Sequence, residues 1–141
     1  MRKGNSILAS RLVTGAVKLT RWLRAADPTP RLSGPQASAM GIIVHARRVR
    51  PSELADLEEV KRPTIARTIG QLSSMKLISR VADSSDARSA FLVPTKKGDA
   101  LFAEGQSRRI KPLANALSKL SPMEKRTLEL AAAILDRLLP G

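Results

Sequence analysis

Apolar side chains recur every three or four positions along most of the chain, which is the period of an α-helix. The first such run spans residues 5–26. It stops before residues 27–30, Asp-Pro-Thr-Pro, because each proline lacks an N–H and moves the residue before it away from helical angles. A second helix is expected to begin at Ser33, where Gln36 completes a capping box, and to end within residues 47–51. The pattern therefore predicts two helices before the middle of the chain.

The middle of the chain carries a short helix and a longer one. Residues 52–57 predict the short helix, with Ser52 as its N-cap. Residues 61–75 predict the longer one, because apolar side chains lie on one face at positions i, i+4 and i+7. A polar turn at residues 58–60 separates the two. This order of helix, turn and helix is typical of a helix-turn-helix motif.

Two short strands and two further helices are predicted after this motif. Residues 77–82 and 89–93 are expected to pair as a hairpin whose polar tip is residues 83–88. Thr95 caps the next helix, and residues 121–124 form a capping box that opens the last one. The predicted fold class is therefore mainly α with a small β-hairpin wing, a winged helix-turn-helix with additional helices at both ends of the chain.

Charge adds a class of partner to this pattern. The 141 residues include 25 Lys and Arg against 12 Asp and Glu, a formal net charge of +13, and the excess is greatest in the first fifty residues. Such a surface binds polyanions, because Lys and Arg displace the counterions that surround phosphates. The three aromatic residues, Trp22, Phe91 and Phe102, are too few to stack single-stranded bases. Duplex DNA is therefore favoured over single strands.

Catalytic patterns are absent from the sequence, so an enzyme is not expected. The chain has no cysteine and one histidine, His45, which leaves no thiolate nucleophile and no two-histidine metal site. Asp83, Asp86 and residues 58–59 fall in predicted turns, where carboxylates commonly accept backbone hydrogen bonds. We expect no cofactor and no metal. The longest uncharged stretch, residues 32–46, is too short to span a membrane and no signal peptide is evident, which predicts a cytoplasmic protein.

The predicted helix at residues 61–75 carries most of the candidate DNA-binding residues. A recognition helix reads bases with side chains near its N-terminus, where backbone N–H groups also meet phosphates. Arg67 can bridge guanine O6 and N7, and Thr64 can contact a phosphate or a thymine methyl group. No carboxylate lies between Val60 and Ala82, so the cations of this stretch, Arg80 among them, are unopposed in the sequence. The candidates in and before the helix are Ser52, Lys61, Arg62, Pro63, Thr64, Arg67, Thr68 and Gln71.

An ordered set of short motifs makes this prediction more specific. The motifs are Ser52-Glu53-Leu54-Ala55, then Arg62-Pro63-Thr64-Ile65-Ala66-Arg67-Thr68-Ile69-x-Gln71-Leu72, then Leu77-Ile78-Ser79-Arg80, then Asp83-x-x-Asp86-x-Arg88 and Thr95-x-x-Gly98. With this spacing, nearly the whole chain resembles the MarR family of transcriptional regulators. The chain departs from the family pattern at Lys76, where many members have glycine, so we expect a left-handed conformation there. It also departs at Pro94, which replaces a usual leucine.

The resemblance implies one domain, residues 1–141, in which different segments serve dimerisation and DNA binding. By resemblance, residues 1–27 and 95–141 form dimerisation helices, and residues 33–94 form the winged helix-turn-helix lobe. The family pattern also implies that Arg88 enters the minor groove while Asp86 holds its guanidinium in place. Members respond to small aromatic acids or to thiol oxidation. The resemblance therefore implies a small-molecule effector as a further partner, whereas the lack of cysteine excludes a thiol switch.

We therefore expect a homodimeric, sequence-specific regulator that binds double-stranded DNA. It would act as a repressor on a pseudo-palindromic operator, with helix 61–75 in the major groove, wing 83–88 in the minor groove, and half-sites about one helical turn apart. One alternative is a non-specific architectural protein that binds nucleic acid through its basic N-terminal third, which predicts steep salt dependence and no preferred sequence. A second alternative is an adaptor protein built on the terminal helices, and monomeric behaviour would count against this adaptor as well as the regulator.

Overall fold

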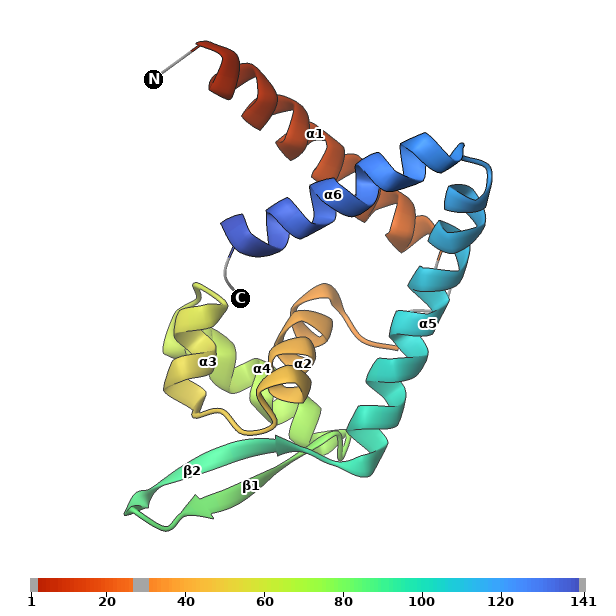
Figure 1. Cartoon of the computed structure of the whole chain (residues 1–141). Coiled ribbons are helices and arrows are strands. Elements are labelled where there is room, and N and C mark those ends of the chain that lie inside the picture. The colour runs from red at the N-terminus through yellow and green to blue at the C-terminus, as the bar shows by residue number, and fades with distance from the viewer. Residues whose placement is uncertain (1–2, 27–30, 140–141) are drawn as a thin grey trace. The chain divides into compact units, whose positions relative to one another are not determined.

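The structure, a computed structural model, describes residues 3–26 and 31–139 and consists there of helices and one two-stranded sheet (Figure 1). The mainly helical fold with a β-hairpin confirms the predicted fold class. The chain divides into two compact units, Thr29–Ser107 and a second unit that joins Met1–Pro28 to Arg108–Gly141. The predicted helix end at residues 27–30 lies outside the described residues. No helix in the described part is long and apolar enough to cross a membrane.

The unit Thr29–Ser107, called the lobe below, contains the helix-turn-helix and the hairpin. Its elements are α2 (Gly34–Ala46), α3 (Pro51–Leu57), α4 (Arg62–Ser74), β1 (Ile78–Asp83), β2 (Asp86–Pro94) and the first turns of α5 (Lys96–Ser118). The predicted order of elements is therefore confirmed, with ends that differ by at most three residues.

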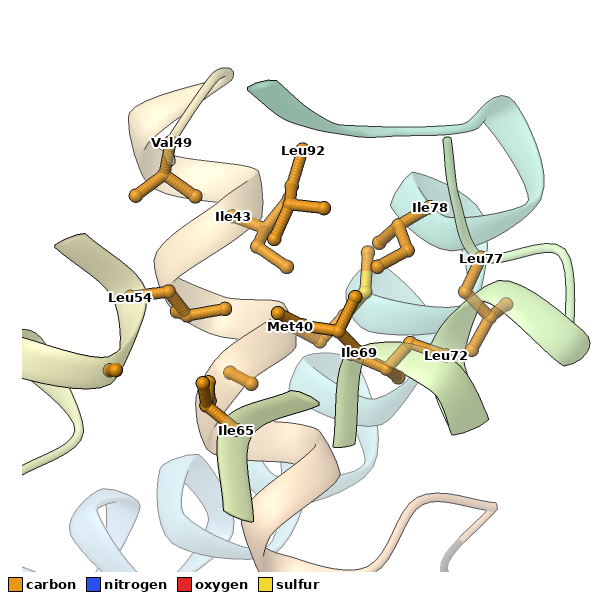
Figure 2. Packing of buried hydrophobic residues seen from close by; sticks show 12 residues of the cluster. Met40, Ile43, Val49, Leu54, Ile65, Ile69, Leu72, Leu77, Ile78 and Leu92 are labelled. Atoms are coloured by element: carbon orange, nitrogen blue, oxygen red, sulfur yellow. The ribbon is translucent and has the colours of Figure 1, made fainter. Parts of the chain in front are cut away.

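Apolar side chains from all these elements form one core (Figure 2). Met40 and Ile43 of α2 are fully buried, as are Leu72 of α4 and Leu92 of β2. Burying a side chain of this size contributes about 2 kcal/mol relative to leaving it in water. The same core contacts the start of α5 through Leu101, so the first turns of α5 pack with the lobe. Packing against α2 and the hairpin thus holds α4 in position.

The helix starts follow the predicted capping chemistry, with one correction. The backbone N–H of Ser33 donates to Gln36 Oε1 at 2.9 Å, which confirms the capping box of α2. Ser52 was predicted as the N-cap of α3, but Arg50 is the N-cap and its backbone N–H donates to Glu53 Oε2 at 2.7 Å. The helix starts earlier because Pro51 occupies its first position, where a fixed φ favours helix and the missing N–H costs nothing.

The wing is longer, and its turn shorter, than the sequence predicted. The strands β1 and β2 pair antiparallel out to Asp83 and Asp86, so Ser84 and Ser85 alone form the turn in place of the expected tip at residues 83–88. The register is irregular between Ala82 and Asp83. Pro94 closes β2 opposite Ile78, at a strand end where a missing N–H is tolerated.

A tight junction joins α4, β1 and α5. Lys76 has a φ of 60°, which confirms the predicted left-handed residue after α4. The backbone N–H of Leu77 donates back to Leu72 O at 3.0 Å, as in helix ends of this kind. Thr95 Oγ1 donates to Lys76 O at 2.7 Å and accepts from the Gly98 N–H at 3.0 Å, which confirms Thr95 as the cap of α5.

The second unit contains α1 (Lys3–Ala25), the remainder of α5 and α6 (Pro122–Leu138). The backbone N–H of Ser121 donates to Glu124 Oε2 at 2.8 Å, which confirms the capping box of α6. The apolar side chains of α1 and α6 remain exposed, for example Leu12 at 46% and Ile134 at 52%. A globular chain normally buries an apolar face of this extent, so these helices present a surface without a partner within the described residues.

Candidate nucleic-acid interface

The helix α4 has one buried face and one exposed face. Ile65, Thr68, Ile69 and Leu72 are buried and pack toward the core of the lobe. The exposed residues include all the cations and most of the polar residues predicted to contact DNA, namely Lys61, Arg62, Pro63, Thr64 and Arg67. The side chain of Lys61, the N-cap, makes no capping hydrogen bond, and the first turn contains no acidic residue. The N-terminal half of α4 therefore presents positive charge where a recognition helix contacts DNA.

Two residues predicted on this surface make contacts within the lobe instead. Thr68 is 7% exposed, and its hydroxyl lies 3.4 Å from the Thr64 carbonyl oxygen, so its side chain is not available to DNA. Its position belongs to the stripe of Ile65 and Leu72, which the helical period turns inward. Gln71 is exposed, but its Oε1 accepts from Gln36 Nε2 at 3.1 Å, a bond that ties α4 to α2.

An open groove of about 390 Å³ lies between the start of α4, the start of α3 and the hairpin. The predicted residues Ser52, Arg62 and Arg88 all line it, so the structure brings together positions that are up to 36 residues apart in the sequence. The sequence prediction missed several lining residues as candidate contacts. The complete lining is Arg50, Pro51, Ser52, Arg62, Ile65, Ala66, Ile69, Arg80, Arg88, Ser89 and Ala90.

The groove combines four guanidinium groups with an apolar floor and contains no carboxylate in its lining. Arg50 is neutralised by Asp83 and Glu53. Arg62, Arg80 and Arg88 form no ion pair within the described residues. A guanidinium donates to phosphate oxygens in a planar, two-pronged geometry, so these three residues fit an anionic backbone. The signal for Arg80 was visible in the sequence, as one of the cations unopposed between Val60 and Ala82.

Asp86 shapes the wing differently from the prediction. Its Oδ1 accepts from the backbone N–H of Arg88 at 2.9 Å, and no ion pair joins the two side chains in the described structure. The predicted support of the Arg88 guanidinium by Asp86 is therefore wrong. A carboxylate two residues before an N–H forms a local turn easily, and this bond orients the backbone at Arg88 and leaves its guanidinium exposed.

Asp83 is the buried carboxylate of the wing, with 6% of its surface exposed. Its Oδ1 accepts from the hydroxyl of Ser85 at 2.6 Å and from the Ser85 backbone N–H at 2.9 Å, and its Oδ2 accepts from Arg50. These hydrogen bonds, led by those of Ser85, hold the pKa of Asp83 well below the usual range for a carboxyl group. The charged form is therefore the one that the folded wing stabilises.

The stability contributed by Asp83 is expected to disappear in acid. Because folding lowers its pKa, the contribution is fully present above the unfolded-state pKa of about 4 and is lost as the pH falls toward the folded-state value. The difference in unfolding free energy between the protein and Asp83→Asn should therefore shrink between about pH 5 and about pH 2. Urea denaturation across this range measures it, and a difference independent of pH would contradict the assignment.

The interface offers binding chemistry rather than reaction chemistry. No group of three or more His, Cys, Asp or Glu residues in the described structure could hold a metal ion. The groove contains cations, two hydroxyl groups and apolar side chains, a combination that suits phosphates and the edges of a nucleic-acid groove.

Comparisons with known proteins match these features. The model of the MarR family matches residues 32–90. An uncharacterised helix-turn-helix-type transcriptional regulator of Mycobacterium bovis is 28% identical over 135 residues, which cover 96% of this chain and 94% of that protein. A MarR family protein from Bacillus stearothermophilus has a similar structure, with a TM-score of 0.85, 19% identity, and coverage of 100% of this chain and 99% of that one. A MepR variant from S. aureus bound to an oligodeoxyribonucleotide has a TM-score of 0.67 at 17% identity, covering 93% and 97%.

Proposed function

We propose that the chain is a member of the MarR family of winged helix-turn-helix transcriptional regulators and that it acts as a homodimeric repressor that binds a pseudo-palindromic site in duplex DNA. The observation that carries this proposal is the groove in which the start of α4 and the wing present Arg62, Arg80 and Arg88 together. Because these cations have no carboxylate partner in the described structure, a phosphate backbone can neutralise them without breaking an ion pair.

The terminal helices support a homodimer. α1 and α6 present exposed apolar side chains along their lengths, including Leu8, Leu12, Ile134 and Leu138. The partner that we propose for these side chains is a second copy, and oligomers of this kind are most often two-fold symmetric. A two-fold dimer presents two recognition helices, so the DNA site should be a pseudo-palindrome with half-sites about one helical turn apart. Bound over a promoter, such a dimer would block transcription, which is why we propose a repressor.

In the proposed complex α4 lies in the major groove and the wing in the adjacent minor groove. Arg67 is exposed on α4 and reads bases, while Arg62 and Thr64 at its start contact phosphates or base edges. Arg88 enters the minor groove, where a narrow A·T-rich segment has a negative potential that attracts arginine. Since the similar proteins come from bacteria, whose DNA is in the cytoplasm, we propose that this protein works there.

Arg67→Ala is expected to weaken binding to the preferred duplex about tenfold and to relax the base preference at one position of each half-site. The reason is that a bidentate arginine contact discriminates between bases, whereas a phosphate contact does not. Affinity measured by fluorescence anisotropy on the preferred duplex and on single-base variants checks both effects. Lys76→Ala is the matched control, because it removes one exposed charge just after the same helix. Equal affinity of Arg67→Ala and the unmodified protein for every duplex would contradict the role of Arg67.

Selection of bound duplexes from a random pool at physiological salt separates the regulator from the non-specific architectural protein. The proposal predicts an enriched motif with two-fold symmetry and a spacing of about one helical turn. Binding that falls steeply with salt but enriches no motif would support the architectural alternative. Only the regulator requires placed side chains in addition to a net charge of +13.

A further inference from the structure

We propose that Arg50 and Asp83 form a latch that fixes the wing to the helix-turn-helix and thereby positions Arg88 for the minor groove. This inference rests on the proposed DNA binding and adds two positioning residues to it. Neither residue needs to touch DNA. Their role is to hold the far end of the hairpin against the start of α3, at one side of the groove that Arg88 also lines.

The carboxylate of Asp83 accepts several hydrogen bonds at the tip of the wing. Besides the two bonds from Ser85, its Oδ2 accepts from Ser89 Oγ at 3.2 Å and from Arg50 Nη2 at 2.5 Å. The side chain of Asp83 is 4% exposed, whereas the neighbouring residues 84–86 are exposed. A carboxylate buried to this extent needs partners for its lone pairs, and the turn, strand β2 and the start of α3 supply them through Ser85, Ser89 and Arg50.

Arg50 is held at the other end of the latch. It is the N-cap of α3, its Nη1 lies 3.5 Å from Glu53 Oε1, and its guanidinium lies 4.6 Å from the ring centre of Phe91 in β2. Arg48 also lies over the Phe91 ring, at 3.8 Å. Between the two arginines, Val49 pairs with Leu92 as an isolated β-bridge, with hydrogen bonds of 3.1 and 2.8 Å. The segment before α3 therefore contacts the wing at its base as well as near its tip.

Arg88 lies between these two attachments. The bridge at Leu92 fixes β2 on one side, and the bond from Ser89 to Asp83 fixes the residue next to Arg88. Asp86 accepts from the Arg88 backbone N–H on the other side. A two-stranded hairpin is marginally stable by itself, and its far end frays first. The latch restrains the far end of the hairpin in the free protein. Less conformational entropy is therefore lost when Arg88 binds DNA.

For Asp83→Asn, the latch and the loss of one negative charge predict opposite changes in DNA affinity. Removing a carboxylate from a cationic surface strengthens DNA binding if charge alone matters, and it also frees Arg50 to contact a phosphate. The latch predicts weaker binding to the preferred duplex, by about fivefold, because the wing loses its anchor. Arg50→Met, which keeps apolar contact with Phe91, should weaken binding by a similar factor. Arg31→Met is the matched control, since Arg31 pairs with Glu104 outside the groove, and it should change affinity less than about twofold.

A double-mutant cycle distinguishes positioning from direct contact. If Arg50 acts through Arg88, the variant with both Arg50→Met and Arg88→Ala should bind no more weakly than Arg88→Ala alone, within about twofold. Additive losses would mean that Arg50 contacts DNA itself or acts by another route, and would overturn the proposal. Stronger binding by Asp83→Asn would overturn it as well.

Backbone dynamics test the latch without DNA, so its failure and the failure of the proposed function can be told apart. In the free protein, ¹⁵N relaxation should show ordered amides at Arg88 and Ser89, with order parameters near 0.8, falling below about 0.6 in Asp83→Asn and in Arg50→Met. Amides in α2 should not change in these variants, which also verifies that they fold. Unchanged order in the wing of both variants would refute the latch, whatever DNA the protein binds.

Discussion

Ile134→Glu is expected to convert the protein into monomers and to lower its affinity for a duplex with two half-sites about 100-fold or more. Ile134 is 52% exposed on α6, among apolar side chains that include Leu130 and Leu138. In the proposed dimer this surface is buried, and an unpaired carboxylate buried there costs several kcal/mol. Each lobe then binds its half-site alone, without the effective concentration that the second lobe provides. Sedimentation and anisotropy on one-site and two-site duplexes measure both effects.

Ala133→Glu is the matched control for this substitution. Ala133 lies on the face of α6 that carries Arg126, Glu129 and Arg137, at helical spacing, and is exposed. Both variants add one negative charge to α6. They differ only in the face of the helix on which the charge is placed. We expect Ala133→Glu to remain dimeric. A dimeric Ile134→Glu variant with normal affinity would show that α6 is not the dimer interface.

Gly98→Ala is expected to destabilise the lobe by about 3 kcal/mol. A Cβ atom at this position would lie 2.0 Å from Leu77 O and 2.8 Å from the end of Met40, both closer than atoms can approach. Met40 can adjust, but Leu77 O accepts from the Thr95 N–H at 3.0 Å, so moving this carbonyl disrupts the junction between β1 and α5. The free energy of unfolding in urea measures the loss.

Gly70→Ala provides the comparison for Gly98→Ala. Gly70 is in the same lobe, inside α4, and a Cβ there would have no atom within 4 Å. Alanine is the better helix former, so this variant should be more stable by up to about 1 kcal/mol. If both glycine variants unfold at the same urea concentration, the close packing at Gly98 does not limit stability.

Local chemistry explains why much of the fold was predictable. The capping boxes at Ser33 and Ser121 and the left-handed residue Lys76 depend on neighbours within a few positions, and all three appear in the structure. The predicted start of α3 at Ser52 was wrong, because Pro51 occupies the first helical position and Arg50 is the N-cap. The inward position of Thr68 could have been inferred from the stripe of Ile65, Ile69 and Leu72, since helical period alone gives its direction.

The groove and the wing contacts could not be predicted in this way, because their partners are far apart in the sequence. Asp83 and Asp86 were equivalent as turn carboxylates, and the structure gives them different roles. Asp86 bonds locally to the Arg88 backbone, while Asp83 meets Arg50 across 33 residues. No periodicity encodes such a pair. It follows from the bridge between Val49 and Leu92, which brings the segment before α3 alongside β2.

By itself, the sequence determined the order and type of the elements, the cations at the start of α4, and the resemblance to the MarR family, whose model matches residues 32–90. These follow from period, capping and composition, which act over a few residues at a time. Only the tertiary structure decided that Arg62, Arg80 and Arg88 share one groove, that Arg50 is neutralised while they are not, and that Asp83 is buried. The physical reason is that packing α2 against α4 and β2 sets the distances between side chains that are remote in sequence, and charge interactions depend on those distances.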